Sequence, residues 1–331
     1  MIRLLFAGTP EVAVAPLRAL ADDDEHFEVV AVLTRPDAPR GRGRKLEPSP
    51  VKRLAFELGI PVLEGDPNEP AFLTELKASG AQAAAVVAYG KILKEPVLEA
   101  LPMGWYNLHF SLLPQWRGAA PVQRAIWAGD TLTGATVFRI TKGMDSGPIL
   151  AQSTLEIGPH DTSGVVLDRL SQDGSHLLAS TLQAMAEDQI RPVDQPQGAY
   201  EVARKIGVED AHIRFDVPAF AADRQIRACT PEPGAWCVLD TTDAATVPDA
   251  TPSSPSGETL HVLEAKPADA TRPETPTHLE PGRLSIGKRH VWVGTASEPL
   301  ELITVKAQGK RAMAAADWAR GARLPDTATC R

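Results

Sequence analysis

The first half of the chain alternates between short apolar runs and segments whose apolar residues recur at helical spacing. The apolar runs predict strands at residues 2–6, 27–33, 83–88, 105–110 and 135–140. Helical spacing predicts helices at residues 12–20, 51–58 and 121–128, and a long amphipathic helix from residue 161 onward. Strands that alternate with helices are typical of a parallel sheet covered by helices on both faces. We therefore expect an α/β domain in this half.

The pattern changes after residue 188, where a polar stretch containing Pro192, Pro196 and Gly198 predicts a linker. Beyond it, short apolar runs separated by turns predict strands at residues 236–239, 260–263, 284–286, 291–293 and 300–305. Such strands favour a small β-barrel or sandwich. Residues 240–281 contain seven prolines among many polar residues, and we expect much of that stretch to be mobile loop. The domains are thus predicted at 1–189 and 210–331, with a linker at 190–209.

The composition is that of a globular protein with two domains. The chain has 331 residues, of which 43% are apolar and 23% are charged. No apolar run is long enough to span a membrane, and the N-terminal run ends at Gly8, too early for a signal peptide. Cys229, Cys237 and Cys330 form no close pair in the sequence and lie near no histidine at ligand spacing. We expect a cytoplasmic protein with reduced thiols, no metal site and no membrane contact.

Two side chains suited to acyl transfer occur in the predicted strand at 105–110. Asn107 and His109 are two residues apart, so they project from the same face of the strand, near its carboxyl end. Open α/β sheets place their binding sites at that edge. An amide and an imidazole can both donate hydrogen bonds to a developing oxyanion, and the imidazole can also transfer a proton. By itself, however, Asn-x-His in a strand is more often structural than catalytic.

An acidic residue follows the next predicted strand. Asp145 lies between Gly143 and Gly147, which allow the backbone to approach a partner closely. A carboxylate there could orient His109 and stabilise its protonated form, as the acid of a catalytic triad does. Alone, a glycine-flanked aspartate is more typical of a turn.

A concentrated basic segment contrasts with an acidic whole. The net charge is -8 and the pI is about 5.5, which taken alone argues against binding to nucleic acid. Residues 35–53 nonetheless contain seven basic and two acidic residues, a local excess of five positive charges. Arg42 is flanked by glycines, and Lys52 and Arg53 extend the predicted patch onto the next helix. The patch suits a polyanionic substrate, although such a charge run is more often a solvated surface.

Together these segments resemble the methionyl-tRNA formyltransferase family, and the resemblance runs nearly from end to end. It is carried by residues 6–10, Arg42, 45–46, 48–52, 86–90, 109–123 and 143–147, and more loosely by 227–231 and 309–313. The resemblance implies a Rossmann-like formyltransferase domain with a parallel sheet, followed by an OB-like β-barrel domain that contacts tRNA. It also implies 10-formyltetrahydrofolate as cosubstrate and initiator methionyl-tRNA as partner.

The same resemblance assigns roles to particular residues. It identifies Asn107, His109 and Asp145 as catalytic. It places the folate site along Ser111, Leu112, Leu113 and Pro114, and it places Arg42 in a loop that reaches the acceptor end of tRNA. We expect the enzyme to act as a monomer and to need no metal.

Three other functions remain open at this point. A formyltransferase that uses 10-formyltetrahydrofolate on a small amine would share Asn107, His109 and Asp145 but would not need the basic loop. A formyl-folate hydrolase could use the same residues to activate water. A non-catalytic RNA-binding module would be expected to lack one of the three residues, and all three are present. The glycine-rich motifs of nicotinamide and ATP sites do not occur, which excludes those classes.

Overall fold

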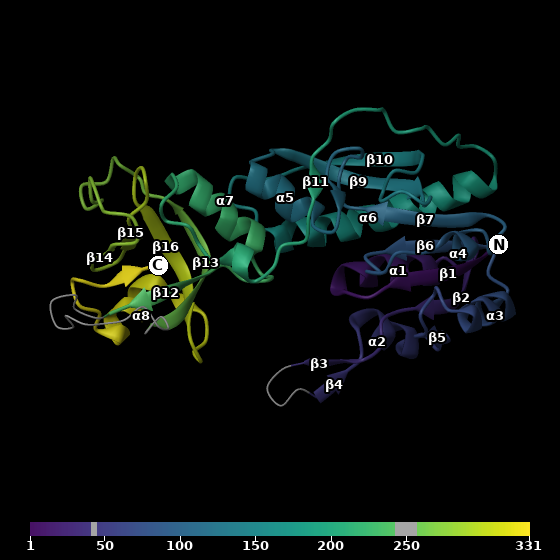
Figure 1. Cartoon of the computed structure of the whole chain (residues 1–331), viewed down its shortest axis with the longest axis horizontal. Coiled ribbons are helices and arrows are strands. Elements are labelled where there is room, and N and C mark those ends of the chain that lie inside the picture. Colours follow the sequence, from purple (N-terminus) through teal and green to yellow (C-terminus); the bar gives the residue numbers. More distant parts are fainter. Residues whose placement is uncertain (41–44, 242–256) are drawn as a thin grey trace. The chain divides into compact units, whose positions relative to one another are not determined.

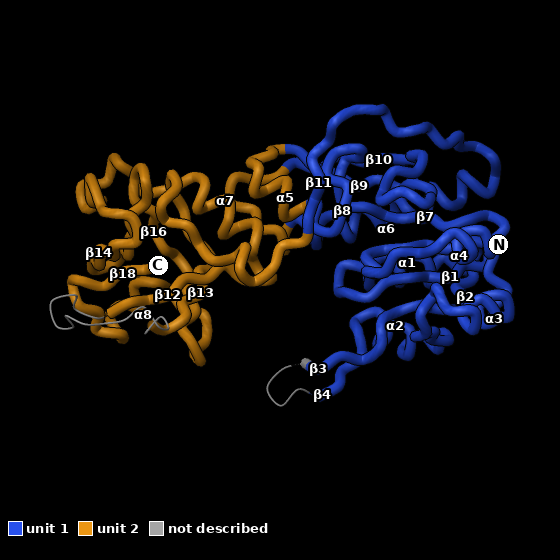
Figure 2. Tube along the Cα trace, in the orientation of Figure 1, with its two compact units in different colours: residues 1–121, 132–156, 166–204 blue, residues 122–131, 157–165, 205–331 orange. Residues whose placement is uncertain are grey.

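The computed structural model describes residues 1–40, 45–241 and 257–331, and the chain forms two compact units (Figure 2). Unit 1 consists of residues 1–121, 132–156 and 166–204, and unit 2 consists of residues 122–131, 157–165 and 205–331. Two short segments of the first half thus belong with the second half. Hydrogen bonds hold them there, as when the Ser163 hydroxyl donates to the Thr230 carbonyl. The domain boundaries at 190 and 209 remain a prediction from the sequence pattern.

Within the described residues, unit 1 is built on one seven-stranded sheet (Figure 1). Its order is β10-β9-β7-β6-β1-β2-β5, from β1 (Ile2–Gly8), β2 (Phe27–Leu33), β5 (Val62–Leu63), β6 (Ala83–Val87), β7 (Gly104–His109), β9 (Leu132–Arg139) and β10 (Ile149–Glu156). Strands β5, β2, β1, β6 and β7 are parallel, which confirms the predicted Rossmann-like core. Two more strands extend the sheet, with β9 antiparallel to β7 and β10 antiparallel to β9. The alternating pattern does not predict these antiparallel pairs. For β10 the reason is the short connection at 140–148, because a parallel return needs a crossover of about a dozen or more residues.

The helices of the first half are α1 (Val14–Asp22), α2 (Pro50–Glu57), α3 (Pro70–Ser79), α4 (Glu95–Leu98), α5 (Pro121–Ala128) and α6 (Ser163–Ala186), with a 3-10 turn η1 (Glu11–Ala13) before α1. Four of them, α1, α2, α5 and α6, begin and end close to where the sequence pattern predicts them, whereas α3 and α4 were not predicted. Trp105 of β7 is buried in one apolar core with Phe72 of α3. Leu108 of β7 lies against Gly174 of α6, where an added Cβ would come within 3.0 Å of its side chain. Because residues 105 and 108 point to opposite faces of the strand, α3 and α6 cover opposite faces of the sheet.

Two short strand pairs lie outside the main sheet of the described part of unit 1. Strand β3 (Ala38–Arg40) pairs antiparallel with β4 (Lys45–Glu47), and β8 (Arg117–Gly118) pairs parallel with β11 (Val202–Ala203). Strand β11 lies within the predicted linker at 190–209. The part of this linker up to residue 204 belongs to unit 1. A further bridge joins Val193 of this stretch to Ile149 of β10. Residues 190–204 are therefore attached to the sheet and to the segment that follows β7.

Unit 2 contains an antiparallel sheet that nearly closes into a barrel. Among the described residues its order is β14-β15-β16-β13-β12-β18, with β17 paired to β16. The strands are β12 (Trp236–Asp240), β13 (Glu258–Pro267), β14 (Leu284–Ile286), β15 (Val291–Val293), β16 (Leu300–Ala307), β17 (Met313–Ala314) and β18 (Thr329–Cys330). The two ends of the sheet meet, because the Leu284 N–H donates to the Ala328 carbonyl and the Cys330 N–H donates to the Gly282 carbonyl. Helices α7 (Ala219–Cys229) and α8 (Ala315–Ala322) and the 3-10 turn η2 (Glu209–Ala211) accompany this predicted β-barrel.

The proline-rich stretch at 240–281 is more regular than predicted where the structure describes it. Strand β13 is longer than the predicted strand at 260–263 and pairs with both β12 and β16. Its alternating Leu260 and Val262 side chains are buried, and this burial stabilises the strand despite the polar flanks. Residues 242–256, for which a mobile loop is predicted, lie outside the described residues.

The three cysteines all lie buried in unit 2 as free thiols. Cys237 of β12 and Cys330 of β18 are neighbours, although they are far apart in the sequence. A hydrogen bond with the Cys330 thiol, together with burial, raises the pKa of the Cys237 thiol well above its ordinary value. A raised pKa keeps this thiol protonated and unreactive.

Every helix in the described ranges is too short or too polar to span a lipid bilayer. This holds for α6, which at 24 residues is long enough but has a polar face. Its buried side chains, among them Val166, Leu170 and Leu178, form the apolar stripe that the helical spacing predicts.

Candidate active site at the end of β7

Strand β7 carries the first two predicted catalytic residues at its carboxyl end. Asn107 pairs with Val86 on one side and with Phe138 on the other, so this part of β7 lies inside the sheet. His109 is only 6% exposed, and its ring packs edge-on against Phe138 at a centroid distance of 6.4 Å. Asn107 is half-buried, and its side-chain amide makes no hydrogen bond to another described residue. The strand therefore presents a held imidazole and an unused amide on one face.

Asp145 reaches the same place by a route that the sequence pattern does not show. Strand β9 runs antiparallel to β7, so its last residue, Arg139, lies opposite Tyr106 and not at the carboxyl end of β7. The connection at 140–148 folds back from there, with Asp145 in the left-handed region at φ +45°. Its Oδ2 lies 3.8 Å from Nδ1 of His109. This distance exceeds a hydrogen bond, so the two groups form an ion pair when the imidazole is protonated.

The second ring nitrogen of His109 also faces an oxygen. Its Nε2 lies 3.0 Å from the backbone carbonyl oxygen of Trp116. A protonated imidazole has two N–H donors, and here each nitrogen is directed at an acceptor, the Trp116 carbonyl or the Asp145 carboxylate. Both ring nitrogens therefore have an oxygen nearby, and these two contacts determine the orientation of the ring.

The Asp145 carboxylate is itself held by the segment that follows β7. Its Oδ2 accepts a hydrogen bond of 2.9 Å from the Gly118 N–H. Gly118 has a φ of +126°, and an added Cβ would lie 2.6 Å from the Ala203 carbonyl oxygen. Only glycine fits this position without displacing the backbone. Gly118 does not stand out in the sequence, because a lone glycine after a strand is an ordinary turn signal.

A second residue absent from the sequence-based site is Gln195. Its side-chain amide donates to the backbone carbonyls of Asp145 and Gly147, at 2.8 and 2.7 Å. Gln195 lies in a polar, proline-containing stretch, where no spacing or motif separates it from its neighbours. Only the folded chain shows that it touches the Asp145 loop.

The predicted folate segment, Ser111 to Pro114, is held mainly by its own neighbours. Ser111 and Leu113 are buried, whereas Leu112 and Pro114 are half-buried. The Ser111 hydroxyl donates to the Gln115 carbonyl at 2.6 Å. This contact occupies the Ser111 donor within the protein and leaves the half-buried apolar side chains as the accessible surface. A folate contact along this segment remains a prediction.

The structure corrects the predicted extent of the basic patch. Arg42 lies outside the described residues. Lys52, predicted to extend the patch, is buried at 8% exposure, and its Nζ lies 2.6 Å from Asp37 Oδ1 and 2.8 Å from Glu64 Oε1. Hydrogen bonds to these two carboxylates raise the pKa of Lys52 above its ordinary value. The charge of Lys52 is thus compensated inside unit 1, whereas Arg53 is exposed as predicted.

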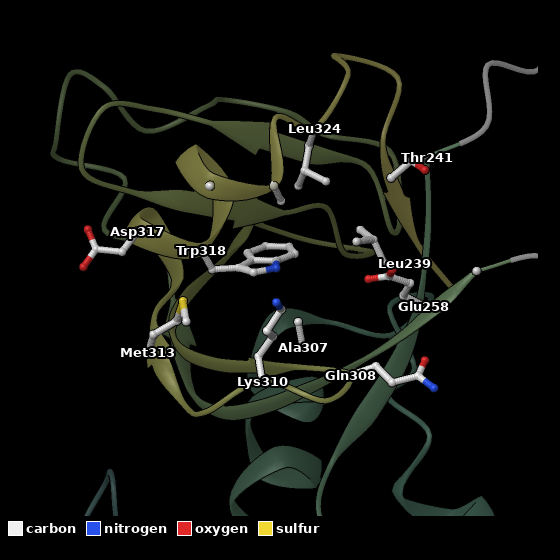
Figure 3. Close-up of a pocket in the computed structure, with 13 residues that line it drawn as sticks. Leu239, Thr241, Glu258, Ala307, Gln308, Lys310, Met313, Asp317, Trp318 and Leu324 are labelled. Carbon is white, nitrogen blue, oxygen red and sulfur yellow. The ribbon is translucent and has the colours of Figure 1, made fainter.

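A separate pocket of about 860 Å³ opens in unit 2 (Figure 3). Its lining includes Leu239, Glu258, Lys310, Asp317 and Trp318. None of the predicted site residues belongs to this lining. Lys310 lies in the 309–313 segment that carries part of the sequence resemblance, so the pocket lies in a region that the sequence already associates with the second domain.

Comparison with known proteins agrees with the two-domain formyltransferase fold. A family profile described as formyl transferase matches residues 2–182, and one described as the formyl transferase C-terminal domain matches residues 205–323. A methionyl-tRNA formyltransferase of Bifidobacterium adolescentis is 70% identical over 330 residues, covering 100% of both chains. One of Bifidobacterium animalis subsp. lactis is 65% identical over 328 residues, covering 99% of both.

Among solved structures, an N-formyltransferase of Helicobacter canadensis in complex with folinic acid and dTDP-3-aminofucose has a TM-score of 0.61. The match covers 91% of this chain and 99% of that one, and at 18% identity it shows a shared fold alone. The full-length relatives decide the assignment, because their identity extends through both units. The chain therefore belongs to the methionyl-tRNA formyltransferase family.

Proposed function

We propose that the chain transfers the formyl group of 10-formyltetrahydrofolate to the α-amino group of methionine on initiator tRNA, with Asn107, His109 and Asp145 as catalytic residues. The observation that carries the catalytic assignment is the His109 imidazole, which is buried with Nδ1 3.8 Å from the Asp145 carboxylate. The substrate assignment is supported by two relatives named methionyl-tRNA formyltransferase, which match this chain over its full length. Action in the cytoplasm and as a monomer remains a prediction.

The reaction forms a bond between the methionine nitrogen and the formyl carbon, and it breaks the bond from that carbon to N10 of the folate. Between these events the formyl oxygen carries negative charge. The Asn107 amide and the protonated His109 donate hydrogen bonds to that oxyanion, which lowers the barrier. During this step the substrate oxygen replaces the Trp116 carbonyl as the partner of Nε2, because catalytic hydrogen bonds often form only in the complex.

Protons balance in this transfer without a strong base. The attacking nitrogen loses one proton and N10 gains one, and His109 is the side chain placed to move it. An α-amino group has a pKa of about 7.7 to 8.0, so a usable neutral fraction exists near pH 7. Asp145 stabilises the charged imidazole while the proton is held there.

The remaining contacts follow the sequence predictions. The folate lies along Ser111 to Pro114, where Leu112 and Pro114 offer half-buried apolar surface. Arg42 contacts the acceptor end of the tRNA, because a segment with this many basic residues suits a polyanion.

The test is steady-state kinetics of the Asn107→Ala and His109→Ala variants with methionyl-tRNA. Loss of one oxyanion donor typically costs on the order of 10² to 10³-fold in kcat, and we expect that loss with a small change in KM. His26→Ala is the matched control, because its Nδ1 also faces a carboxylate, Asp23 Oδ1 at 2.7 Å, away from this site. An unchanged kcat in either test variant removes that residue from the mechanism.

The same assay separates the alternative functions. Formyl-methionyl-tRNA and free tetrahydrofolate are quantified in parallel, with and without tRNA. Release of tetrahydrofolate without formylated tRNA would favour the hydrolase. Faster formylation of a small amine than of methionyl-tRNA would favour the small-substrate enzyme.

A further inference from the structure

Gln195 is a buried amide within an exposed stretch. Residues 191–194 and 196–199 are all exposed, whereas Gln195 is only 5% exposed. Burial of an amide is unfavourable unless its hydrogen bonds are satisfied. The chain therefore places one polar side chain into unit 1 for the sake of its contacts.

Those contacts use the whole capacity of the amide. The nitrogen donates to the carbonyl oxygens of Asp145 and Gly147, and the oxygen accepts from Nε and Nη2 of Arg117, at 2.9 and 2.5 Å. An amide offers two donors and two lone pairs, so all four are engaged. The two carbonyls can only accept and the guanidinium can only donate, and this determines which end of the amide faces which group.

The four bonds connect the two segments that hold the catalytic carboxylate. Asp145 and Gly147 belong to the 140–148 loop, and Arg117 precedes Gly118, whose N–H donates to Asp145 Oδ2. The loop is bonded by Gln195 at Asp145 itself and two residues later. A shift of Gln195 would therefore move the loop relative to β8 and change the position of the Asp145 carboxylate.

The stretch that carries Gln195 is itself anchored on both sides. Val193 bridges to Ile149 of β10, and Val202 and Ala203 form β11 against β8. The Arg117 guanidinium also lies over the Tyr200 ring, at 5.9 Å from its centroid. Backbone pairing on both sides therefore fixes the position of Gln195, and from this position its side chain can hold the 140–148 loop.

We propose that Gln195 is a positioning residue for formyl transfer, which holds the 140–148 loop so that the Asp145 carboxylate faces His109. The inference rests on the proposed catalytic role of Asp145 and deepens it. Gln195 touches no reacting atom, and its effect on the rate passes through Asp145. Misplacement of a catalytic group by about 1 Å can cost on the order of 100-fold in rate, so this role has a measurable size.

The first experiment compares Gln195→Met and Gln195→Glu with the parent enzyme. Methionine preserves the length and removes all four hydrogen bonds, whereas glutamate keeps an acceptor for Arg117 but faces the two carbonyls without donors. We expect both to lower kcat about 10- to 100-fold, while the folate Kd and the KM for methionyl-tRNA change less than about threefold. Melting curves show whether each variant is folded. If the methionine variant does not fold, the glutamate variant decides the outcome.

Gln225 provides a matched control in unit 2. It is 3% exposed, its oxygen accepts from the Arg214 N–H, and its nitrogen donates to the carbonyls of Asp210 and His212. Gln225→Met therefore removes a similar set of buried bonds within unit 2, whereas the Asp145 loop belongs to unit 1. We expect it to lower the melting temperature and to leave kcat unchanged. An equal fall of kcat in both methionine variants would show a general structural effect and overturn the proposal.

A double-mutant cycle tests whether Gln195 acts through Asp145. In an Asp145→Asn background, Gln195→Met should lower the residual kcat by less than about threefold, because the carboxylate that it positions is gone. If the two residues acted independently, the effects of the two substitutions on kcat would multiply, and that result would overturn the inference. A folded Gln195→Met enzyme with parental kcat would also overturn it. The kcat of the single Asp145→Asn variant tests a different point, the catalytic role of Asp145 itself. If this variant retains parental kcat, the proposed catalytic role of Asp145 fails, whatever Gln195 does.

Discussion

Replacement of Asp145 by asparagine changes the charge at the candidate site with little change in shape. Asparagine keeps an oxygen that can accept the Gly118 N–H, which donates to Asp145 Oδ2 at 2.9 Å in the parent. The loop can therefore stay in place. The partner that His109 loses is the negative charge 3.8 Å from its Nδ1.

The size of the effect follows from that distance. Two unit charges at 3.8 Å attract each other by about 4 kcal/mol at an effective dielectric constant of about 20. Each 1.36 kcal/mol lost from the stabilisation of the transition state lowers the rate about tenfold. Asp145 retains a side-chain exposure of 21%, and the solvent there reduces the attraction. We therefore expect kcat to fall roughly 10²- to 10³-fold.

The assay measures turnover and folate affinity on the same preparation. Formylation of methionyl-tRNA at saturating 10-formyltetrahydrofolate gives kcat, and equilibrium titration gives the folate Kd, which we expect to be unchanged. Asp161→Asn is the matched control, because Asp161 Oδ2 likewise accepts a backbone N–H from a glycine, Gly158 at 2.8 Å, within unit 2. Its kcat should equal that of the parent.

Three results would refute the reasoning. A kcat of Asp145→Asn within threefold of the parent would show that the negative charge beside His109 does not act on the transition state. Weak folate binding with normal turnover at saturation would place Asp145 in the folate site. A fall of kcat in Asp161→Asn would show that loss of such a carboxylate acts through the fold.

Three further substitutions test other parts of the molecule. Arg42→Ala should strongly lower kcat/KM for methionyl-tRNA and leave folate affinity intact. It should also make the log–log salt dependence of tRNA binding shallower. Equal activity of the variant and the parent on methionyl-tRNA, at low and at high salt, would show that Arg42 does not contact the tRNA. Lys52→Met should cost on the order of 1 kcal/mol of unfolding free energy without changing that salt dependence. Because the pKa of Lys52 is raised in the folded state, its contribution is present below pH 10.5 and is lost as the pH rises through the raised pKa, which denaturant unfolding at several pH values checks. Gly118→Ala should lower kcat by about tenfold or more because its Cβ would meet the Ala203 carbonyl, whereas Gly59→Ala, at φ +68° with open space around it, should affect stability alone.

Most of the secondary structure could be predicted from the sequence, because it depends on local patterns. Helix α5 and strands β14 and β15 begin and end at the predicted residues. The short β17 and β18 were not predicted, because two residues carry no periodicity. Neither was the direction of β9, because the apolar pattern of a strand is the same whichever way it runs.

The candidate site divides in the same way. Asn107 and His109 are two residues apart in one strand, so the period of the strand alone determines that they share a face. Asp145 could be proposed from its glycine-flanked position and from resemblance. Its approach to His109, however, depends on a loop that folds back after an antiparallel strand.

Contacts between residues far apart in the chain were decided by the tertiary structure alone. Lys52 carries the same charge as its exposed neighbours, and only the folded chain brings Asp37 and Glu64 to it. Gln195 lies in a stretch that the sequence describes only as polar, and folding places it against the Asp145 loop. Local sequence determines which face a side chain takes along its own helix or strand. Which partner it meets there depends on how separate segments pack, and no pattern within either segment contains that information.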